Sequence, residues 1–212
     1  MPRGRLVAFE GVEGCGKSTQ AARFAERMRA HLTREPGGTP LGEVLRDVVL
    51  RRSDPDFDAR AETMVMLAAR AQHVAAVVGP ILEQGRMVVT DRFSHSTLAY
   101  QGYGRGLDLA DLRRMCSWVA RGLWPDLVVL LDVPIEVGQA RRLGPSDRLE
   151  AAGEEFHQRV RDGFLTLASE DPSGWVVVDG IGPVEDVAAL VADGYQRWLG
   201  PAEPTRLPGW AQ

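Results

Sequence analysis

The sequence is short of several residue types, and each shortage excludes something. Its 212 residues include no asparagine, a single lysine and only two cysteines, Cys15 and Cys116. Two cysteines cannot make the disulfide framework of a small secreted domain, which favours a reducing, cytoplasmic location. The net charge of −4 provides no broad basic surface, so we expect no nucleic-acid polymer as a partner.

Long apolar runs are also lacking. No window approaches ~20 uninterrupted apolar residues, and the N-terminus leads into a strand-like segment rather than a signal peptide. We therefore expect no membrane partner. Hydrophobic residues make up 44% and charged residues 25%, the balance of a soluble globular protein. With no repeat or linker, we expect one domain over residues 1–200 and a loosely ordered C-terminal tail at 201–212.

Short apolar runs predict the buried strands of an α/β fold. They are continuous rather than alternating, as expected where helices cover both faces of a parallel sheet. We predict a doubly wound, mostly parallel sheet flanked by helices, with a short lid segment and with ligands at the carboxyl ends of the strands. The predicted strands lie at 5–10, 87–90, 127–131 and 175–178, and the predicted helices at about 17–30, 41–51, 59–84 and 184–199.

Residues 11–18, Gly-Val-Glu-Gly-Cys-Gly-Lys-Ser, match the phosphate-binding pattern G-x-x-x-x-G-K-[ST] between a predicted strand and a predicted helix. The glycines let successive N–H groups point at phosphate oxygens, and the helix adds the positive end of its dipole. Arginine supplies 24 of the 25 basic residues, so the only lysine, Lys17, is informative. It is expected to bridge the β- and γ-phosphates of ATP, with the Ser18 hydroxyl on Mg²⁺. The predicted ATP-binding residues are Gly11, Val12, Glu13, Gly14, Cys15, Gly16, Lys17, Ser18 and Thr19.

The same loop occurs in switch GTPases, motor ATPases and small-molecule kinases. A switch GTPase reads guanine through an Asn-Lys-x-Asp segment, which a chain without asparagine cannot contain. A motor ATPase is usually larger, with adjacent carboxylates after a hydrophobic strand, whereas one strand here ends at Asp91-Arg92. That pair suits phosphoryl transfer between two nucleotides. Arg141, Arg142 and Arg148 fall on the predicted lid at 138–150, where arginines stabilise transition-state charge and closure excludes water.

Six segments of the chain, spread over about residues 5–199, resemble bacterial thymidylate kinases, a P-loop nucleoside monophosphate kinase family. The family transfers the γ-phosphate of ATP to dTMP, which implies ATP, Mg²⁺, dTMP and the P-loop NTPase fold for this chain. The segments are 9–19 (FEGVEGCGKST), 33–39 (TREPGGT), 70–73 (RAQH), 91–93 with 96–102 (DRF, STLAYQG), 122–127 with 131–134 (GLWPDL, LDVP) and 147–150 (DRLE).

The resemblance also implies roles for individual side chains. Glu13 would face the acceptor sugar, Arg92 would hold the acceptor phosphate, and Arg70 would hydrogen-bond the thymine edge. Tyr100, below the sugar, would favour deoxyribose over ribose. The implied catalytic residues are Lys17, Asp91, Arg92, Arg142 and Arg148, and the implied metal ligands are Ser18 and Asp91. The implied substrate-binding residues are Glu13, Arg34, Pro36, Met66, Arg70, Arg92, Thr97, Tyr100 and Gln101.

The chain departs from the family pattern at several positions. Met66 stands where the family usually has a phenylalanine that stacks on thymine, and a thioether also packs on a ring face. His95 replaces the family's acid by a residue near its titration point, which predicts an altered pH dependence or local hydrogen bond. The connection before Thr33 is short, so we expect a reduced second strand, and the lid is compressed.

Cys15 lies inside the phosphate-binding loop. The N-terminus of the following helix could lower the pKa of its thiol, but we favour the interpretation that Cys15 is a small residue tolerated at a variable position.

Two other functions stay open on the sequence, a deoxynucleoside kinase and a nucleotide-binding regulatory protein without turnover. The helix around residues 61–78 has more apolar residues than one helix face needs. Because the family is dimeric through helices, this pattern indicates a homodimer.

Overall fold

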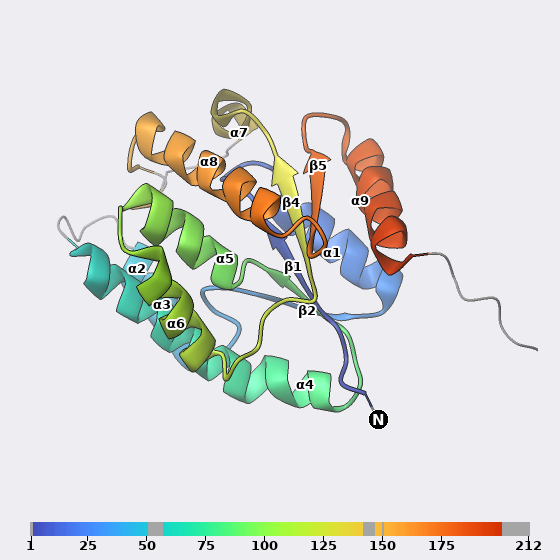
Figure 1. The fold of residues 1–212 in the computed structure, drawn as a ribbon, viewed down its shortest axis with the longest axis horizontal. Helices are drawn as coiled ribbons and strands as arrows, with labels where there is room; N and C mark the ends of the chain where they lie inside the picture. Colours follow the sequence, from blue (N-terminus) through green and yellow to red (C-terminus); the bar gives the residue numbers. More distant parts are fainter. Residues whose placement is uncertain (1, 51–56, 142–146, 150, 201–212) are drawn as a thin grey trace, which may run out of the picture.

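The computed structural model describes residues 2–50, 57–141, 147–149 and 151–200. A five-stranded parallel sheet with strand order β2-β3-β1-β4-β5 forms its centre, with helices packed on both sides (Figure 1). This arrangement confirms the predicted fold class. The strands are β1 (Leu6–Glu10), β2 (His31–Arg34), β3 (Val88–Asp91), β4 (Leu127–Asp132) and β5 (Trp175–Asp179).

The strands that lie inside the sheet are the apolar runs of the sequence. All five residues of β1 are buried, and its side chains alternate between two clusters of apolar residues. Val7 and Phe9 join the larger cluster, whereas Leu6 and Ala8 join the smaller one. Burying a side chain of this size stabilises the fold by about 1.5–3 kcal/mol. The outer strand β2 has only four residues and is half-exposed, as the short connection before it predicts.

Helices cover the sheet and connect its strands. Asp58 begins α3 by accepting hydrogen bonds from the backbone N–H groups of Arg60 and Ala61, the usual role of an N-cap carboxylate. Two π-helical segments, η1 and η2, were not predicted. The elements are α1 (Lys17–Met28), α2 (Pro40–Leu50), α3 (Ala59–His73), η1 (Val74–Val78), α4 (Gly79–Glu83), α5 (Ser94–Thr97), η2 (Leu98–Gly104), α6 (Leu109–Val119), α7 (Ile135–Arg141), α8 (Glu154–Glu170) and α9 (Val184–Leu199).

The stretch from α3 through η1 to α4 is continuous. Among the described residues, Ala59–Glu83 is the one helix long and apolar enough to cross a membrane by length and composition. Its apolar side chains Leu67, Val74, Val78 and Leu82 are buried inside the protein. A helix that packs in a protein core passes the same test of length and composition.

The strand register places the predicted motifs next to one another. Phe9 of β1 and Arg34 of β2 both lie opposite Asp91 at the end of β3. The loop after β1, which carries the phosphate-binding pattern, therefore lies beside Asp91-Arg92. Asp132 ends β4 on the other side of β1, so the predicted ligand-binding edge is the carboxyl edge of the sheet.

Candidate active site

The loop between β1 and α1 has the backbone of a phosphate cradle. Gly11, Gly14 and Gly16 have φ values of 143°, 74° and 91°, which favour glycine over residues with a side chain. A Cβ on Gly14 would lie 2.0 Å from the carbonyl oxygen of Gly138 in α7. The glycines therefore serve both the curl of the loop and its close approach to α7. Gly16 is the N-cap of α1, so the N-terminus of that helix points into the loop.

Lys17 is buried, and its ammonium group lies over the loop. Its Nζ is 3.3 Å from the Val12 carbonyl oxygen and 3.4 Å from Oε2 of Glu13. These contacts hold the cation where phosphate oxygens would meet it. Cys15 is buried in the same loop, and burial raises the pKa of its thiol. The interpretation of Cys15 as a small packing residue is therefore supported over a reactive thiolate.

Ser18 and Asp91, the two predicted metal ligands, lie together. The Ser18 hydroxyl donates a hydrogen bond to Oδ2 of Asp91, while Oδ1 of Asp91 is buried and has no partner. No cluster of three or more His, Cys, Asp or Glu side chains suited to a metal occurs in the described part of the chain. A hydroxyl beside one free carboxylate oxygen fits Mg²⁺, which is usually held by one or two carboxylates, waters and substrate phosphates.

Arg92 sits at the centre of the site in a strained backbone conformation. Its φ of 73° is uncommon for a residue with a side chain, and such outliers concentrate at functional sites. The guanidinium donates to Glu13, to Oγ of Ser96 at 2.9 Å and to the Tyr100 hydroxyl at 3.0 Å. Burial favours the protonated form of Glu13, yet the charges of Arg92 and Lys17 hold the pKa of its carboxyl well below the usual range. Glu13 and Arg92 thus form a charged pair at the bottom of the site.

Glu10, the last residue of β1, supports this arrangement and was missed by the sequence reasoning. Its Oε1 accepts the backbone N–H groups of Phe93 at 2.9 Å and Ser96 at 3.1 Å, and its Oε2 accepts the Ser96 hydroxyl. Glu10 is fully buried, and burial raises the pKa of its carboxyl to about 7 against the opposing charge of Arg92. The signal in the sequence was a carboxylate in an otherwise apolar strand.

Two pockets meet at the phosphate-binding loop. The first, which we call the α3-side pocket, encloses about 930 Å³ including its open mouth. The second, the β5-side pocket, lies toward the segment after β5. Both are lined by Glu13, Lys17 and Ser18. The α3-side pocket is also lined by the predicted residues Arg34, Pro36, Met66, Arg70, Asp91, Arg92, Thr97, Tyr100 and Gln101.

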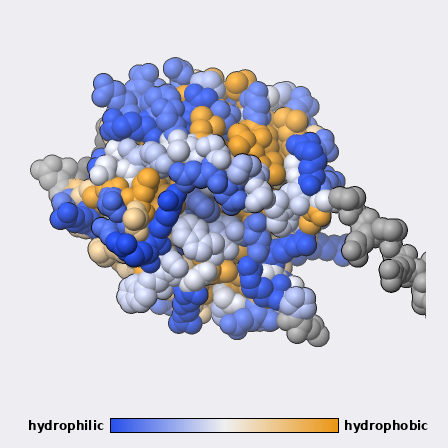
Figure 2. Space-filling model, viewed as in Figure 1, coloured by the Kyte–Doolittle hydropathy of each residue, from blue (hydrophilic) through white to orange (hydrophobic). Residues whose placement is uncertain are grey.

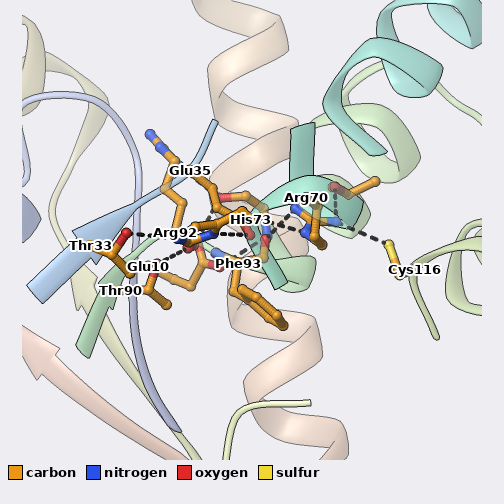
Figure 3. A network of polar contacts seen from close by, with 11 residues as sticks. Glu10, Thr33, Glu35, Arg70, His73, Thr90, Arg92, Phe93 and Cys116 are labelled. Atoms are coloured by element: carbon orange, nitrogen blue, oxygen red, sulfur yellow. Dashed lines mark hydrogen bonds and ion pairs between the residues drawn. The ribbon is translucent and has the colours of Figure 1, made fainter. Parts of the chain in front are cut away.

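Arg70 in the α3-side pocket is held by a buried polar network (Figure 3). Its Nε donates to Oε2 of Glu35 at 2.7 Å, and the other Glu35 oxygen is 2.9 Å from Nδ1 of His73. Figure 3 shows Arg70 between this Glu35–His73 pair and Cys116. Burial favours the protonated form of Glu35, but Arg70 and His73 hold its pKa below the ordinary value. The network ties α3 to β2 and to the loop after it, because Glu35 lies in that loop and Nε2 of His73 contacts the hydroxyl of Thr33 in β2 at 2.7 Å.

Other predicted residues line the rest of the α3-side pocket. Arg34 is more than half exposed and pairs with Glu43 of α2 at 2.8 Å. Met66 is half-buried in the pocket wall, where the family usually has phenylalanine. Tyr100 is buried, and the guanidinium carbon of Arg92 lies 4.9 Å from the centre of its ring.

The β5-side pocket is lined by the start of α1 and by the loop after β5. Besides the phosphate-binding loop, it is lined by Thr19, Gln20, Arg141 and residues of the segment from Gly180 to Val187. The Arg141 guanidinium donates to the Gly180 carbonyl at 2.7 Å and to the Ile181 carbonyl. The nine predicted ATP-binding residues lie on this loop and the first turn of α1. Seven of them, from Glu13 to Thr19, line the pocket.

The two lid arginines that the structure describes, Arg141 and Arg148, lie in different surroundings. Arg142 lies outside the described residues. Arg148 is turned toward α2 and α3. Its Nη2 donates to Oε2 of Glu62 in α3 at 2.7 Å, and its Nε donates to the Val49 carbonyl in α2 at 3.0 Å. Arg141, the third candidate, borders the β5-side pocket.

His95 contradicts one expectation, since it does not titrate near neutral pH. The ring lies between Trp124 and Trp175, at 5.2 Å and 4.9 Å between ring centres. Burial lowers the pKa of His95 to about 3, and its Nδ1 has no hydrogen-bond partner. His95 therefore remains neutral and acts as an aromatic packing residue.

Asp132, which ends β4, is bound by both Nε and Nη2 of Arg161, at 2.7 Å and 2.9 Å.

A parallel sheet with a phosphate-binding loop at its carboxyl edge, and with two pockets joined at the lysine of that loop, defines a P-loop phosphotransferase. The sequence profile of the Thymidylate kinase family matches residues 9–191 of the chain. The chain therefore belongs to the thymidylate kinase family.

Individual relatives agree with this assignment. The chain is 43% identical over 203 residues to the thymidylate kinase of Citrifermentans bemidjiense, covering 90% of each chain. It is 46% identical over 191 residues to that of Pseudomonas fluorescens, covering 87% of this chain and 91% of the relative. The crystal structure of thymidylate kinase from Ehrlichia chaffeensis superposes with a TM-score of 0.77 at 30% identity, over 92% of this chain and 100% of that one.

Proposed function

We propose that the chain is an ATP-dependent thymidylate kinase, which transfers the γ-phosphoryl group of ATP to dTMP and yields ADP and dTDP for dTTP synthesis. The observation that carries the proposal is the meeting of two pockets at Glu13, Lys17 and Ser18. Direct transfer needs a donor and an acceptor on either side of one phosphate-binding loop. An oxygen of the dTMP phosphate attacks the γ-phosphorus, and the bond from that phosphorus to the β-phosphate oxygen breaks.

The donor side uses the loop and its helix. The backbone N–H groups of residues 11–18 and the N-terminus of α1 bind the phosphates of ATP, and Lys17 neutralises charge on the β- and γ-phosphates. Ser18 and the free Oδ1 of Asp91 would hold Mg²⁺. The ion would neutralise charge on the donor phosphates. The adenine end lies in the β5-side pocket.

The acceptor side uses the α3-side pocket. Arg92, buried beside Glu13 and Tyr100, binds the phosphate of dTMP and keeps it in line with Lys17. Glu13 accepts a hydrogen bond from the 3′-hydroxyl of the sugar, and Tyr100 fills the space that a ribose 2′-hydroxyl would need. Arg70 and Gln101 face the edge of the base, with Thr97 behind Arg70 at 2.9 Å. Arg34, Pro36 and Met66 line the pocket around them.

Arg142 and Arg148 act when the lid closes. Arg148 is bound to Glu62 and the Val49 carbonyl, so it has to leave these partners to reach the transferring group. Catalysis then comes from positioning and charge neutralisation, since phosphoryl transfer requires little covalent chemistry from the protein.

Release of ADP tests the proposal against the two alternatives. With ATP and Mg²⁺, turnover is expected with dTMP and little with thymidine or other nucleoside monophosphates. Turnover with thymidine but not with dTMP would identify a deoxynucleoside kinase. ATP binding without turnover of any acceptor would identify a regulatory protein and contradict the proposal.

We also propose that the enzyme works in the cytoplasm as a homodimer. Three exposed apolar residues, Leu41, Val44 and Val48, have relative exposures of 51%, 59% and 37% and repeat along α2 at the spacing of one helix face. Met64 of the adjacent α3 is 54% exposed. These four residues, which we call the α2–α3 surface, form the contact between subunits.

A further inference from the structure

Glu62 is a fully buried carboxylate in the first turn of α3 that no sequence motif indicated. Its Oε1 accepts the side-chain amide N–H of Gln101 at 2.8 Å. Its Oε2 accepts from Nη2 of Arg148 at 2.7 Å and from Nη2 of Arg105 at 3.1 Å. Glu62 therefore connects α3, η2 and the lid segment 147–149.

This carboxylate decides which end of the Gln101 amide faces the α3-side pocket. A carboxylate accepts hydrogen bonds and donates none, whereas an amide side chain has a donor end and an acceptor end. The NH₂ end of Gln101 must therefore face Glu62, as it does. Its carbonyl Oε1 is left for the pocket, and no group in the described ranges donates to that atom. The pocket thus presents a hydrogen-bond acceptor at this position.

Arg70 presents the complementary group in the same pocket. A guanidinium has five N–H donors, and those of Arg70 make four contacts, with Glu35, Thr97, Cys116 and the Phe93 carbonyl. One N–H on Nη2 remains for a ligand. The pocket therefore offers one donor and one acceptor to the edge of a base.

The pyrimidines differ at that edge. Thymine and uracil present a donor at N3 and an acceptor at O4, whereas cytosine presents an acceptor at N3 and an amino donor at C4. We propose that Glu62 is a specificity-determining positioning residue. By fixing the Gln101 carbonyl toward the pocket, it selects a base with a protonated N3 and rejects cytosine. The inference rests on the proposed function, in which a pyrimidine monophosphate occupies this pocket.

The variant Glu62→Gln tests the inference, because glutamine at 62 presents either amide end and lets Gln101 turn over. The measured quantity is the ratio of kcat/KM for dTMP to kcat/KM for dCMP, with ATP saturating. We expect the ratio to fall at least about tenfold, since an unpaired buried polar group is what rejects the wrong base. In the matched control Arg105→Gln, which removes another partner of Glu62 but leaves the bond to Gln101, the ratio should stay within about twofold of the wild-type value.

A purely structural role for Glu62 would lower kcat/KM for both nucleotides together and leave the ratio unchanged, which would overturn the inference. A second measurement does not depend on turnover or on a substitution at Glu62. In the wild-type chain, the side-chain amide protons of Gln101, assigned by their loss in Gln101→Met, should exchange slowly with D₂O. Exchange as fast as that of exposed glutamines would equally overturn the inference. Absence of dTMP turnover in the wild type would defeat the proposed function alone, because the exchange measurement still decides the role of Glu62.

Discussion

Glu10 is a buried residue whose protonation changes the stability of the folded chain. Its pKa of about 7 compares with an ordinary value of 4.5. Between these pH values the folded state holds a proton that the unfolded state has released. The free energy of unfolding therefore falls as the pH rises through this interval, by up to about 3 kcal/mol for this one group.

The variant Glu10→Gln should lose this dependence, because its amide imitates the protonated acid. We expect wild type to lose stability relative to the variant between pH 4.5 and 7, measured by urea unfolding at matched pH values. Taking the difference between the two proteins removes the contribution of His95, which has the opposite sign: its pKa of about 3 lies below the ordinary 6.5, so stability is lost as the pH falls. If the free energies of unfolding of wild type and variant changed in parallel with pH, the raised pKa of Glu10 would be contradicted.

Lys17 is the residue on which we expect transfer to depend most. It is buried in the loop, yet its two contacts there are long, at 3.3 Å and 3.4 Å, so it contributes little to folding. We expect Lys17→Ala to lower kcat by at least about 10²–10³-fold, with the unfolding midpoint close to that of wild type. Lys17→Arg should also lose most activity, since a planar guanidinium does not replace a compact ammonium. Wild-type rates in either variant would rule out the assigned role of Lys17.

At the scale of elements, alanine substitutions at two glycines of the phosphate-binding loop distinguish the cost of backbone strain from the cost of a steric clash. A Cβ on Gly16 would have no neighbouring atom within 4 Å. Gly16→Ala should therefore lower the free energy of unfolding only through the backbone strain at a φ of 91°, by about 1–2 kcal/mol. Gly14→Ala adds a clash with the Gly138 carbonyl of α7, about a further 1–3 kcal/mol. Urea unfolding of both variants should show the larger loss for Gly14→Ala. Equal losses would mean that α7 does not pack against the loop.

The elements that the sequence predicted are those with a local signal. The apolar runs at 87–90 and 127–131 became β3 and β4 within one residue, and the final helix was predicted with its observed bounds, Val184–Leu199. The π-helical segments escaped prediction because their hydrogen-bond pattern depends on neighbouring elements. The phosphate-binding loop was predictable because its pattern lies in eight consecutive residues.

The supporting residues of the site were not predictable in this way. Glu10, Glu35 and Glu62 act through partners that are 35 to 86 residues away in the sequence. In a sequence, a buried carboxylate cannot be distinguished from a solvated one unless its hydrogen-bond partner is known. For the same reason the sequence did not predict that His95 is neutral, because its two tryptophan neighbours are distant in the sequence.

At the scale of the whole molecule, the α2–α3 surface predicts the oligomeric state. Figure 2 shows a face that is mostly hydrophilic, with apolar residues in small groups between polar ones. Val44 is 59% exposed on α2, where a charge would oppose subunit contact without entering the core. We expect a dimer for wild type and a monomer for Val44→Glu, by light scattering at micromolar concentration.

Leu190→Glu is the matched control, because Leu190 is 46% exposed on α9, at the other end of the sheet order. This variant should remain dimeric. A monomeric wild type, or a dimer that survives Val44→Glu, would contradict the proposed interface.

We propose that two nucleotides meet at one phosphate-binding loop, where a phosphoryl group passes from one to the other. The most direct test is the rate of ADP release with ATP, Mg²⁺ and dTMP, compared with the rate when thymidine replaces dTMP. We expect turnover with dTMP, formation of dTDP in equal amount to ADP, and almost none with thymidine. ADP release that does not depend on dTMP, or no release with any nucleotide acceptor, would contradict the account.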